Sequence, residues 1–260
     1  MRQLSMAFAL VACVSLSACV QTRQYADIEF TPPQGEYRLV VLRPDVTVGS
    51  LTTGGMVEPR VEWTDEARTN IVAALRSQQA ARGGDVTIIE HRNELPGVSE
   101  QELADVERLN FVVDESIVEH KYLGDYLPTK RRKGLDWTLG ADAVKLGQKT
   151  GYDYALFLHA EDQVASGGRI ALGLLGLAGC IVGFCAPNVG GAEQLDYASL
   201  VDLKTGDVVW FNVVDAASQV PGIKFGDLRT PQGAQQMVER LLGRMKPGAA
   251  VRRTQARESH

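Results

Sequence analysis

The sequence has few of the residues and motifs that mark an enzyme or a metal site. Only four of its 260 residues are cysteine and four are histidine, and no two histidines stand at metal-ligand spacing. It contains no Gly-x-Ser-x-Gly, no His-Glu-x-x-His and no phosphate-binding loop. Acidic residues (32) outnumber basic ones (27), so no overall basic field would attract nucleic acid. We therefore expect a non-catalytic chain without metal or cofactor that does not bind nucleic acid.

The first 19 residues have the pattern of a bacterial lipoprotein signal. Arg2 precedes an uncharged apolar stretch, residues 4–16, which is too short to span a bilayer. The stretch ends in Leu-Ser-Ala-Cys at residues 16–19, which resembles the lipobox read by lipoprotein signal peptidase. This resemblance implies that residues 1–18 are removed and that Cys19 is lipidated. An ordinary secretory signal that ends in a chance cysteine is the alternative.

The same resemblance implies a location. In the sorting pattern of many Gram-negative lipoproteins, Asp after the lipidated cysteine retains the protein at the inner membrane, and this chain has Val20 there. The outer membrane is therefore favoured over the inner membrane, with the folded part facing the periplasm. Residues 19–35 are expected to be the lipidated N-terminus and a polar tether. A cysteine that carries several acyl chains anchors stably to a membrane, whereas one acyl chain alone anchors weakly.

Two cysteines remain after the signal and Cys19. Cys180 and Cys185 would share an oxidising compartment, so they are candidates for a disulfide. In a regular helix, residues five apart point about 140° away from each other and cannot be bridged. A disulfide here therefore predicts a turn. A zinc site is less favoured, because a second pair of cysteines is absent.

Apolar periodicity predicts one α/β domain over residues 36–246. Strands are expected at residues 36–43, 85–90, 152–160, 195–202 and 207–214. Helices are expected from Thr64, as an N-cap, to Gly83, and at residues 99–123, 138–150 and 230–245. Pro44 should end the first strand, and residues 47–55 should form a loop or hairpin. The order predicts a single α/β sandwich, a mixed sheet of about five strands flanked by helices, with a disordered tail at residues 247–260.

A glycine-rich apolar insertion occupies residues 165–194. Its uncharged run, residues 170–192, is long enough to span a bilayer, but a single span would separate two strands of one sheet. Three alternatives stay open: a transmembrane helix, a hairpin that enters a membrane or joins subunits, and a buried structural insertion. An exposed apolar patch of this size usually marks a contact surface. The candidate contact residues are Leu172, Leu174, Leu175, Leu177, Ile181 and Phe184.

Two smaller features are candidates for contacts. The basic run Lys130, Arg131, Arg132 and Lys133 would suit lipopolysaccharide, anionic lipid or peptidoglycan, although solvation alone also explains such a loop. The isolated His120 and His159 are expected to pack or to form hydrogen bonds inside the domain.

The residues around the last hairpin resemble a known superfamily. Gly-Tyr-Asp-Tyr at residues 151–154 leads into a strand, and Asp-Leu-Lys-Thr-Gly-Asp-Val-Val-Trp at residues 202–210 forms a hairpin, with Gly206 where a positive φ is needed. They resemble the TolB amino-terminal and CsgG-like α/β domains. The resemblance implies a non-catalytic envelope module that binds a protein partner or a second copy of itself. A subunit of an oligomeric secretion or pore assembly, and an unrecognised periplasmic hydrolase, are the alternatives.

Overall fold

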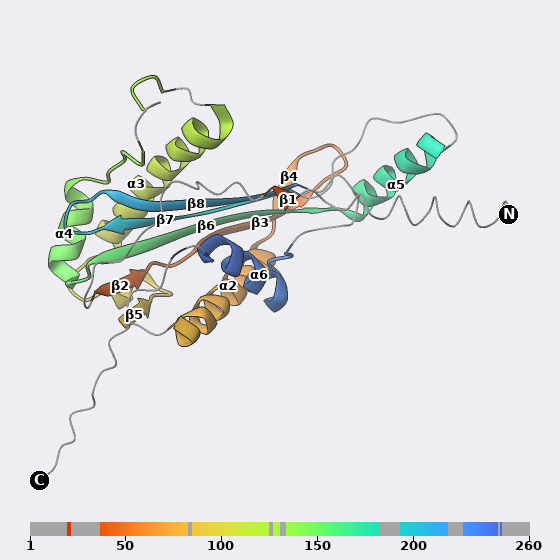
Figure 1. Ribbon diagram of the computed structural model, residues 1–260. Coiled ribbons are helices and arrows are strands. Elements are labelled where there is room, and N and C mark those ends of the chain that lie inside the picture. The colour runs from red at the N-terminus through yellow and green to blue at the C-terminus, as the bar shows by residue number, and fades with distance from the viewer. Residues whose placement is uncertain are drawn as a thin grey trace, which may run out of the picture.

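A mixed sheet of eight strands forms the centre of the fold (Figure 1). The computed structural model describes residues 20–21, 37–82, 85–124, 127–130, 134–181, 193–217, 226–243 and 245. The strands are β1 (Val20–Gln21), β2 (Arg38–Val41), β3 (Asp45–Leu51), β4 (Val57–Pro59), β5 (Asp85–Ile88), β6 (Tyr154–Ala165), β7 (Glu193–Asp202) and β8 (Val208–Ala217). The predicted α/β fold with a mixed sheet is confirmed. The strand missing from the prediction is β1, whereas β3 and β4 lie where the sequence predicts either a loop or a hairpin.

Helices cover both faces of the sheet (Figure 1). The helices are α2 (Val61–Arg82), α3 (Glu100–Val118), α4 (Ala141–Thr150), α5 (Gly167–Ile181) and α6 (Pro231–Leu242), with the short η1 (Arg92–Glu94) and η2 (Glu119–Gly124). Each face has its own apolar core. One lies under α2 and α6 and includes Ile71, Trp210 and Met237, and the other lies under α3 and α4 and includes Leu103 and Phe211. This arrangement is the sandwich that the sequence predicts.

The strand order is β1-β8-β7-β6-β2-β5, and β3 also pairs with β6, beyond β2. The long β6 is therefore parallel to β2 near its start and to β3 near its end. On its other side β6 is antiparallel to β7, and β7 is antiparallel to β8. Strands β3 and β4 form a hairpin, which is one of the two forms expected for residues 47–55.

Pro44 lies between two strands that pair with the same side of β6, because β2 ends at Val41 and β3 begins at Asp45. From Val41 to Asp45 the chain takes four steps, whereas the paired β6 takes three, from Leu156 to His159. The extra residue is a bulge, which shifts the alternation of side chains between the two faces. Odd-numbered Leu39 and Val41 reach the core under α2 before the bulge, and even-numbered residues of β3 reach it afterwards. The first strand thus ends before Pro44, as the sequence predicts, and the chain resumes pairing with β6 as the separate strand β3, one residue out of step.

Local sequence signals predict two boundaries correctly, the start of α3 and the β7–β8 turn, and they predict the start of α2 wrongly. Ser99 accepts a hydrogen bond from the Glu102 N–H in the predicted capping box of α3. Gly206 has φ +82° in the β7–β8 turn, as predicted. Thr64, however, is not an N-cap, because α2 begins at Val61. Its hydroxyl instead accepts a hydrogen bond from the Val48 N–H at 3.0 Å, which covers the free edge of β3.

Candidate functional site

Strand β1 brings the chain next to the predicted lipidation site into the sheet. Val20, which is covalently bonded to Cys19, pairs with Ala216 of β8, and that row of the sheet continues through Gln194 to Asp162 of β6. The end of β6 at Ala165 is three residues further along. Val20 thus lies about 14 Å across the sheet from β6, at three strand spacings. This short part of the predicted tether lies in the sheet, near the end from which α5 extends (Figure 1).

The direction of β1 shows from which side the chain enters. Strands β6 and β8 both run toward the end of the sheet where α5 begins, because each is antiparallel to β7. Strand β1 is antiparallel to β8, so it runs away from that end. The chain that precedes Val20 therefore enters β1 from the α5 end of the molecule. We call this end, with β1, α5 and the β3–β4 hairpin, the anchor end.

The described part of the predicted insertion is a helix with exposed leucines. Helix α5 has 15 residues, and Leu172, Leu174 and Leu175 on it are 45%, 51% and 70% exposed. Burial is therefore wrong as an account of these three side chains. The turn that the hairpin requires lies mostly outside the described residues, so the hairpin stays a prediction. The side chains of Leu177 and Ile181, and the whole of Phe184, lie outside the described residues. Contact with a partner or membrane remains a prediction for all six residues.

Helices were also compared with the length and hydropathy that a membrane span requires. Among the residues that the structure describes, no helix is both long enough and apolar enough to cross a membrane.

Helix α5 is fixed at its base to the β3–β4 hairpin. The Arg169 guanidinium donates a hydrogen bond to the Thr52 carbonyl at 3.1 Å, and the Leu51 carbonyl accepts one from the Ser166 N–H. The hairpin adds an apolar side chain to the same end, because Met56 in its turn is 69% exposed. The anchor end therefore combines two separate exposed apolar segments with the entry of the chain from residue 19.

The predicted disulfide stays a prediction. Helix α5 continues through Cys180 and ends at Ile181, which is four residues before Cys185. Cys19 and Cys185 lie outside the described residues, as does the side chain of Cys180.

The basic run is described only at its first residue. The Lys130 ammonium bonds to Asp136 and lies 4.8 Å from the centroid of the Trp137 ring. Its charge is thus already engaged within the domain. Arg131, Arg132 and Lys133 lie outside the described residues, so the predicted contact with an anionic surface stays untested.

Both predicted internal histidines form hydrogen bonds. His120 is buried, and its Nδ1 accepts from the Leu127 N–H at 3.0 Å. His159 lies on β6 with its Nδ1 3.2 Å from the Asp45 carboxylate, and its ring stacks on Tyr197 at 4.7 Å. The hydrogen bond from His159 is the main cause that lowers the pKa of Asp45. This carboxylate therefore stays ionised near neutral pH and is unsuited to act as a general acid.

A buried polar chain behind Tyr197 contains the carboxyl group of Asp114. Asn110 donates to the Ser199 hydroxyl at 2.9 Å, and this hydroxyl donates to Asp114 at 2.7 Å. Burial raises the pKa of Asp114 well above its usual value, against the effect of these hydrogen bonds. Asp114 is 1% exposed, so its hydrogen bond with Ser199 connects α3 to β7 inside the domain and the carboxyl has no open path to a substrate.

We expect Asp114→Asn to stabilise the protein near neutral pH. The raised pKa keeps the folded carboxyl protonated at pH values where the unfolded chain ionises, so stability is lost as pH rises above the unfolded pKa of about 3.9. Asn keeps an oxygen for the Ser199 hydroxyl and cannot ionise. Urea unfolding at pH 4 and pH 7 should show an advantage for Asn that is larger at pH 7. Asp105→Asn, at an exposed position of the same helix, is the control and should show no such advantage.

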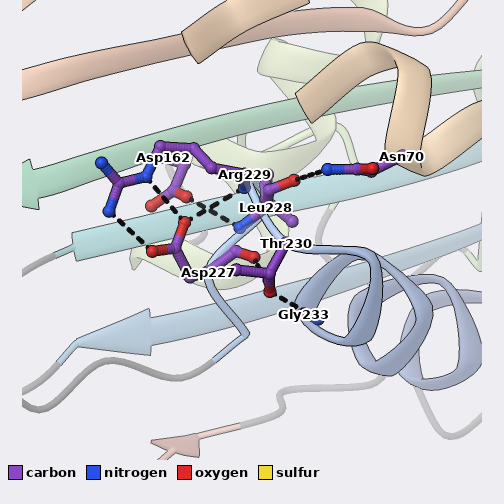
Figure 2. Close-up of polar contacts among 7 residues, drawn as sticks. All are labelled: Asn70, Asp162, Asp227, Leu228, Arg229, Thr230 and Gly233. Atoms are coloured by element: carbon purple, nitrogen blue, oxygen red, sulfur yellow. Dashed lines mark hydrogen bonds and ion pairs between the residues drawn. The ribbon is translucent and has the colours of Figure 1, made fainter. Parts of the chain in front are cut away.

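Asp162 of β6 takes part in a structural contact (Figure 2). Its carboxylate accepts from the Leu228 N–H at 3.3 Å, and the Leu228 carbonyl accepts from Asn70 of α2 at 3.2 Å. Thr230 then caps α6 by accepting from the Gly233 N–H. The segment before α6 is thus fixed to β6 and α2. Across the described ranges, no group of three or more His, Cys, Asp or Glu side chains is placed to hold a metal ion.

Comparisons with known proteins give structural neighbours only. No protein-family model matches the sequence, and no curated protein matches it significantly. The chain is similar to the PelC dodecamer from Paraburkholderia phytofirmans, with 12% identity over 87% of this chain and 98% of that one, at a TM-score of 0.36.

Two further neighbours are the LpoB C-terminal domain from Salmonella enterica (14% identity, 71% of this chain and 86% of that one, TM-score 0.26) and lipoprotein GNA1162 from Neisseria meningitidis (13%, 68% and 81%, TM-score 0.28). At these values the neighbours' names do not define a function for this chain. The resemblance to the TolB and CsgG-like domains stays a prediction from residues 151–154 and 202–210.

Proposed function

We propose that this chain is a non-catalytic lipoprotein of the bacterial envelope, anchored through lipid on Cys19 and serving as a binding or assembly module. The observation that carries the proposal is the entry of the chain into β1 from the anchor end. A lipid on the residue before Val20 would hold that end of the domain against a membrane. Val20 itself, in place of Asp, supports the outer membrane and a domain that faces the periplasm.

Exposed apolar side chains at the anchor end support the same orientation. Four apolar side chains are exposed at this end: Leu172, Leu174 and Leu175 on α5, and Met56 in the hairpin. Removing each of them from water lowers the free energy of the protein. The occupant we propose for this surface is the lipid bilayer that holds the anchor. Helix α5 would lie in the membrane interface as an apolar helix beside the acyl chains. The faces covered by α2, α3 and α4 would stay open to a periplasmic protein partner or a second copy.

Metabolic labelling tests the lipid anchor directly. In a Gram-negative host given radiolabelled palmitate, the wild-type chain should take up label and Cys19→Ser should take up none. Cys13→Ser, which changes a cysteine of the predicted signal, is the matched control and should still be labelled. An unlabelled wild-type chain, or a mature chain that mass spectrometry shows to begin elsewhere than residue 19, would refute the anchor.

A further inference from the structure

A cleft of about 450 Å³ opens at the edge of the sheet, beside the bulge at residues 42–44. Its walls come from the bulge and from α2, η1 and α3. Small-molecule sites in proteins usually have volumes of about 300–1,000 Å³. The cleft is therefore large enough for a small organic ligand. A bulge commonly redirects a side chain at a functional site, and here it carries Arg43.

Positive charge is in excess in this cleft. Four of its lining residues are arginines, whereas Asp45 and Glu107 are its acidic ones. Arg92 pairs with Glu107 at 2.7 Å, and Asp45 bonds to His159. Arg68 pairs with Asp65 on the exposed surface of α2. Glu107 and Asp45 are thus engaged by Arg92 and His159. Arg108, like Arg68, pairs with an aspartate outside the cleft, Asp105.

Arg43 is the arginine left without a counterion. Within the part of the chain that the structure describes, no carboxylate lies within 4.0 Å of its guanidinium, although the side chain is half-buried. Burial and the positive charges of Arg68 and Arg92 lower the pKa of Arg43. Guanidinium groups hold phosphate and carboxylate groups through paired hydrogen bonds. An anion in the cleft would relieve the repulsion among these three arginines.

Aromatic rings form the other wall of the cleft. Phe111 of α3 is 41% exposed, and its ring lies 5.3 Å from that of His159. His159 in turn stacks on Tyr197. Flat apolar surfaces of this kind pack against the rings of aromatic groups and sugars. The cleft therefore offers an anion site and a ring site close together.

We propose that this cleft binds a small anion in which a phosphate or carboxylate group is joined to a ring. The anionic group contacts Arg43 between Arg68 and Arg92, and the ring packs against Phe111 and His159. This proposal goes beyond the envelope anchor and does not depend on it, because it concerns the opposite region of β6 from α5.

Calorimetry on the full chain purified in detergent tests the proposal with four probes. Phenyl phosphate and benzoate carry both parts of the ligand, inorganic phosphate carries only the anion, and benzyl alcohol carries only the ring. We expect the two complete probes to bind and each partial probe to bind at least tenfold more weakly. A complete probe that gives no binding heat at millimolar concentration, or benzyl alcohol that binds as tightly as phenyl phosphate, would overturn the proposal.

The variant Arg43→Gln separates binding from folding. It should weaken phenyl phosphate binding about tenfold to a hundredfold, because one charged hydrogen-bond donor is lost. Its urea midpoint should be unchanged or higher, since a charge that repels Arg68 and Arg92 is removed. Arg76→Gln makes the same change at an exposed position of α2 outside the cleft and should bind within twofold of wild type. Equal affinity in Arg43→Gln and wild type, or equal losses in both variants, would refute the site.

Discussion

Cys19→Ser, expressed behind a signal peptide that ordinary signal peptidase removes, is expected to move most of the chain from the membrane fraction to the soluble periplasmic fraction. A cysteine with several acyl chains gives stable anchoring, whereas the apolar surface left at the anchor end is small. The exposed parts of Leu172, Leu174, Leu175 and Met56 would contribute only about 1 kcal/mol each on entering a bilayer. Fractionation of cells that express the wild type and the variant, followed by a high-salt wash, measures this change.

Helix α5 should account for whatever membrane binding the Cys19→Ser chain retains. Such binding should survive the salt wash, because apolar contacts are not screened by ions. Adding Leu174→Glu and Leu175→Glu should lower partition into phospholipid vesicles about thirtyfold, which corresponds to about 2 kcal/mol. Val112→Glu, at an exposed position on α3 away from the anchor end, is the matched control and should change partition little.

The two parts of this prediction fail in different ways. If the chain with Cys19→Ser and both leucine substitutions stays in membranes after the wash, neither the lipid nor α5 explains attachment. If the leucine substitutions do not change how much of the Cys19→Ser chain binds to vesicles, α5 does not contact the bilayer. The lipid is then the anchor, and α5 has another partner. The second outcome would leave the lipobox intact as evidence for the lipoprotein and remove the bilayer as the occupant of α5.

The helices and strands that the sequence predicted correctly are those determined by local rules. The capping box at Ser99 fixes the start of α3, and Gly206 fixes the β7–β8 turn, because each depends on residues a few positions apart. The helix start assigned to Thr64 failed for the opposite reason. Its hydroxyl binds the edge of β3, which is 16 residues away, and no local pattern distinguishes this contact from a cap.

Long-range pairing explains the parts of the sheet that the sequence missed. Pro44 has no N–H to donate, so it predicts a strand end, but the ladder with β6 resumes at Asp45 because the bulge absorbs the interruption. Strand β1 has only two residues and pairs with Ala216 and Asp215 of β8, which are almost 200 positions later. A pairing of this kind leaves no periodic signal in so short a segment.

The cleft could not be found from the sequence for the same reason. Arg43, Arg68 and Arg92 are spread over 50 residues and belong to three different elements, among 27 basic residues in the chain. Nothing in their spacing distinguishes them from solvated surface arginines. That Arg43 lacks a counterion becomes visible only when the fold has paired Glu107 with Arg92 and Asp45 with His159. The lipobox, in contrast, is a continuous motif that the sequence presents without any fold.

Gly233→Ala is expected to lower the free energy of unfolding more than a glycine-to-alanine change at the start of any other described helix. Gly233 lies in the first turn of α6, against the segment that joins it to the sheet (Figure 2). A Cβ atom there would lie 2.0 Å from the Asp227 carbonyl oxygen and 2.6 Å from its carbonyl carbon. Both are backbone atoms, so no side-chain rotation can relieve the overlap. Either α6 or the segment before it has to move.

Movement of that segment would break contacts that hold it to β6 and α2. Leu228 is fully buried, its N–H bonds to Asp162 and its carbonyl accepts from Asn70. Overpacking of this kind typically costs about 1–3 kcal/mol, and the loss of buried hydrogen bonds adds to it. Alanine also reduces the entropy of the unfolded chain, but that gain is below about 1 kcal/mol. We therefore expect a net loss of about 3 kcal/mol in the free energy of unfolding.

Urea unfolding of the chain in the Cys19→Ser background measures this loss without detergent. Gly167→Ala is the matched control, since it makes the same change in the first turn of α5, where no atom lies within 4 Å of the added Cβ. The control should be unchanged or up to about 1 kcal/mol more stable. If Gly233→Ala stayed within about 1 kcal/mol of wild type, α6 could shift away from the segment at residues 226–230 at little cost. The bonds of Leu228 to Asp162 and Asn70 would then not be what holds α6 against the sheet.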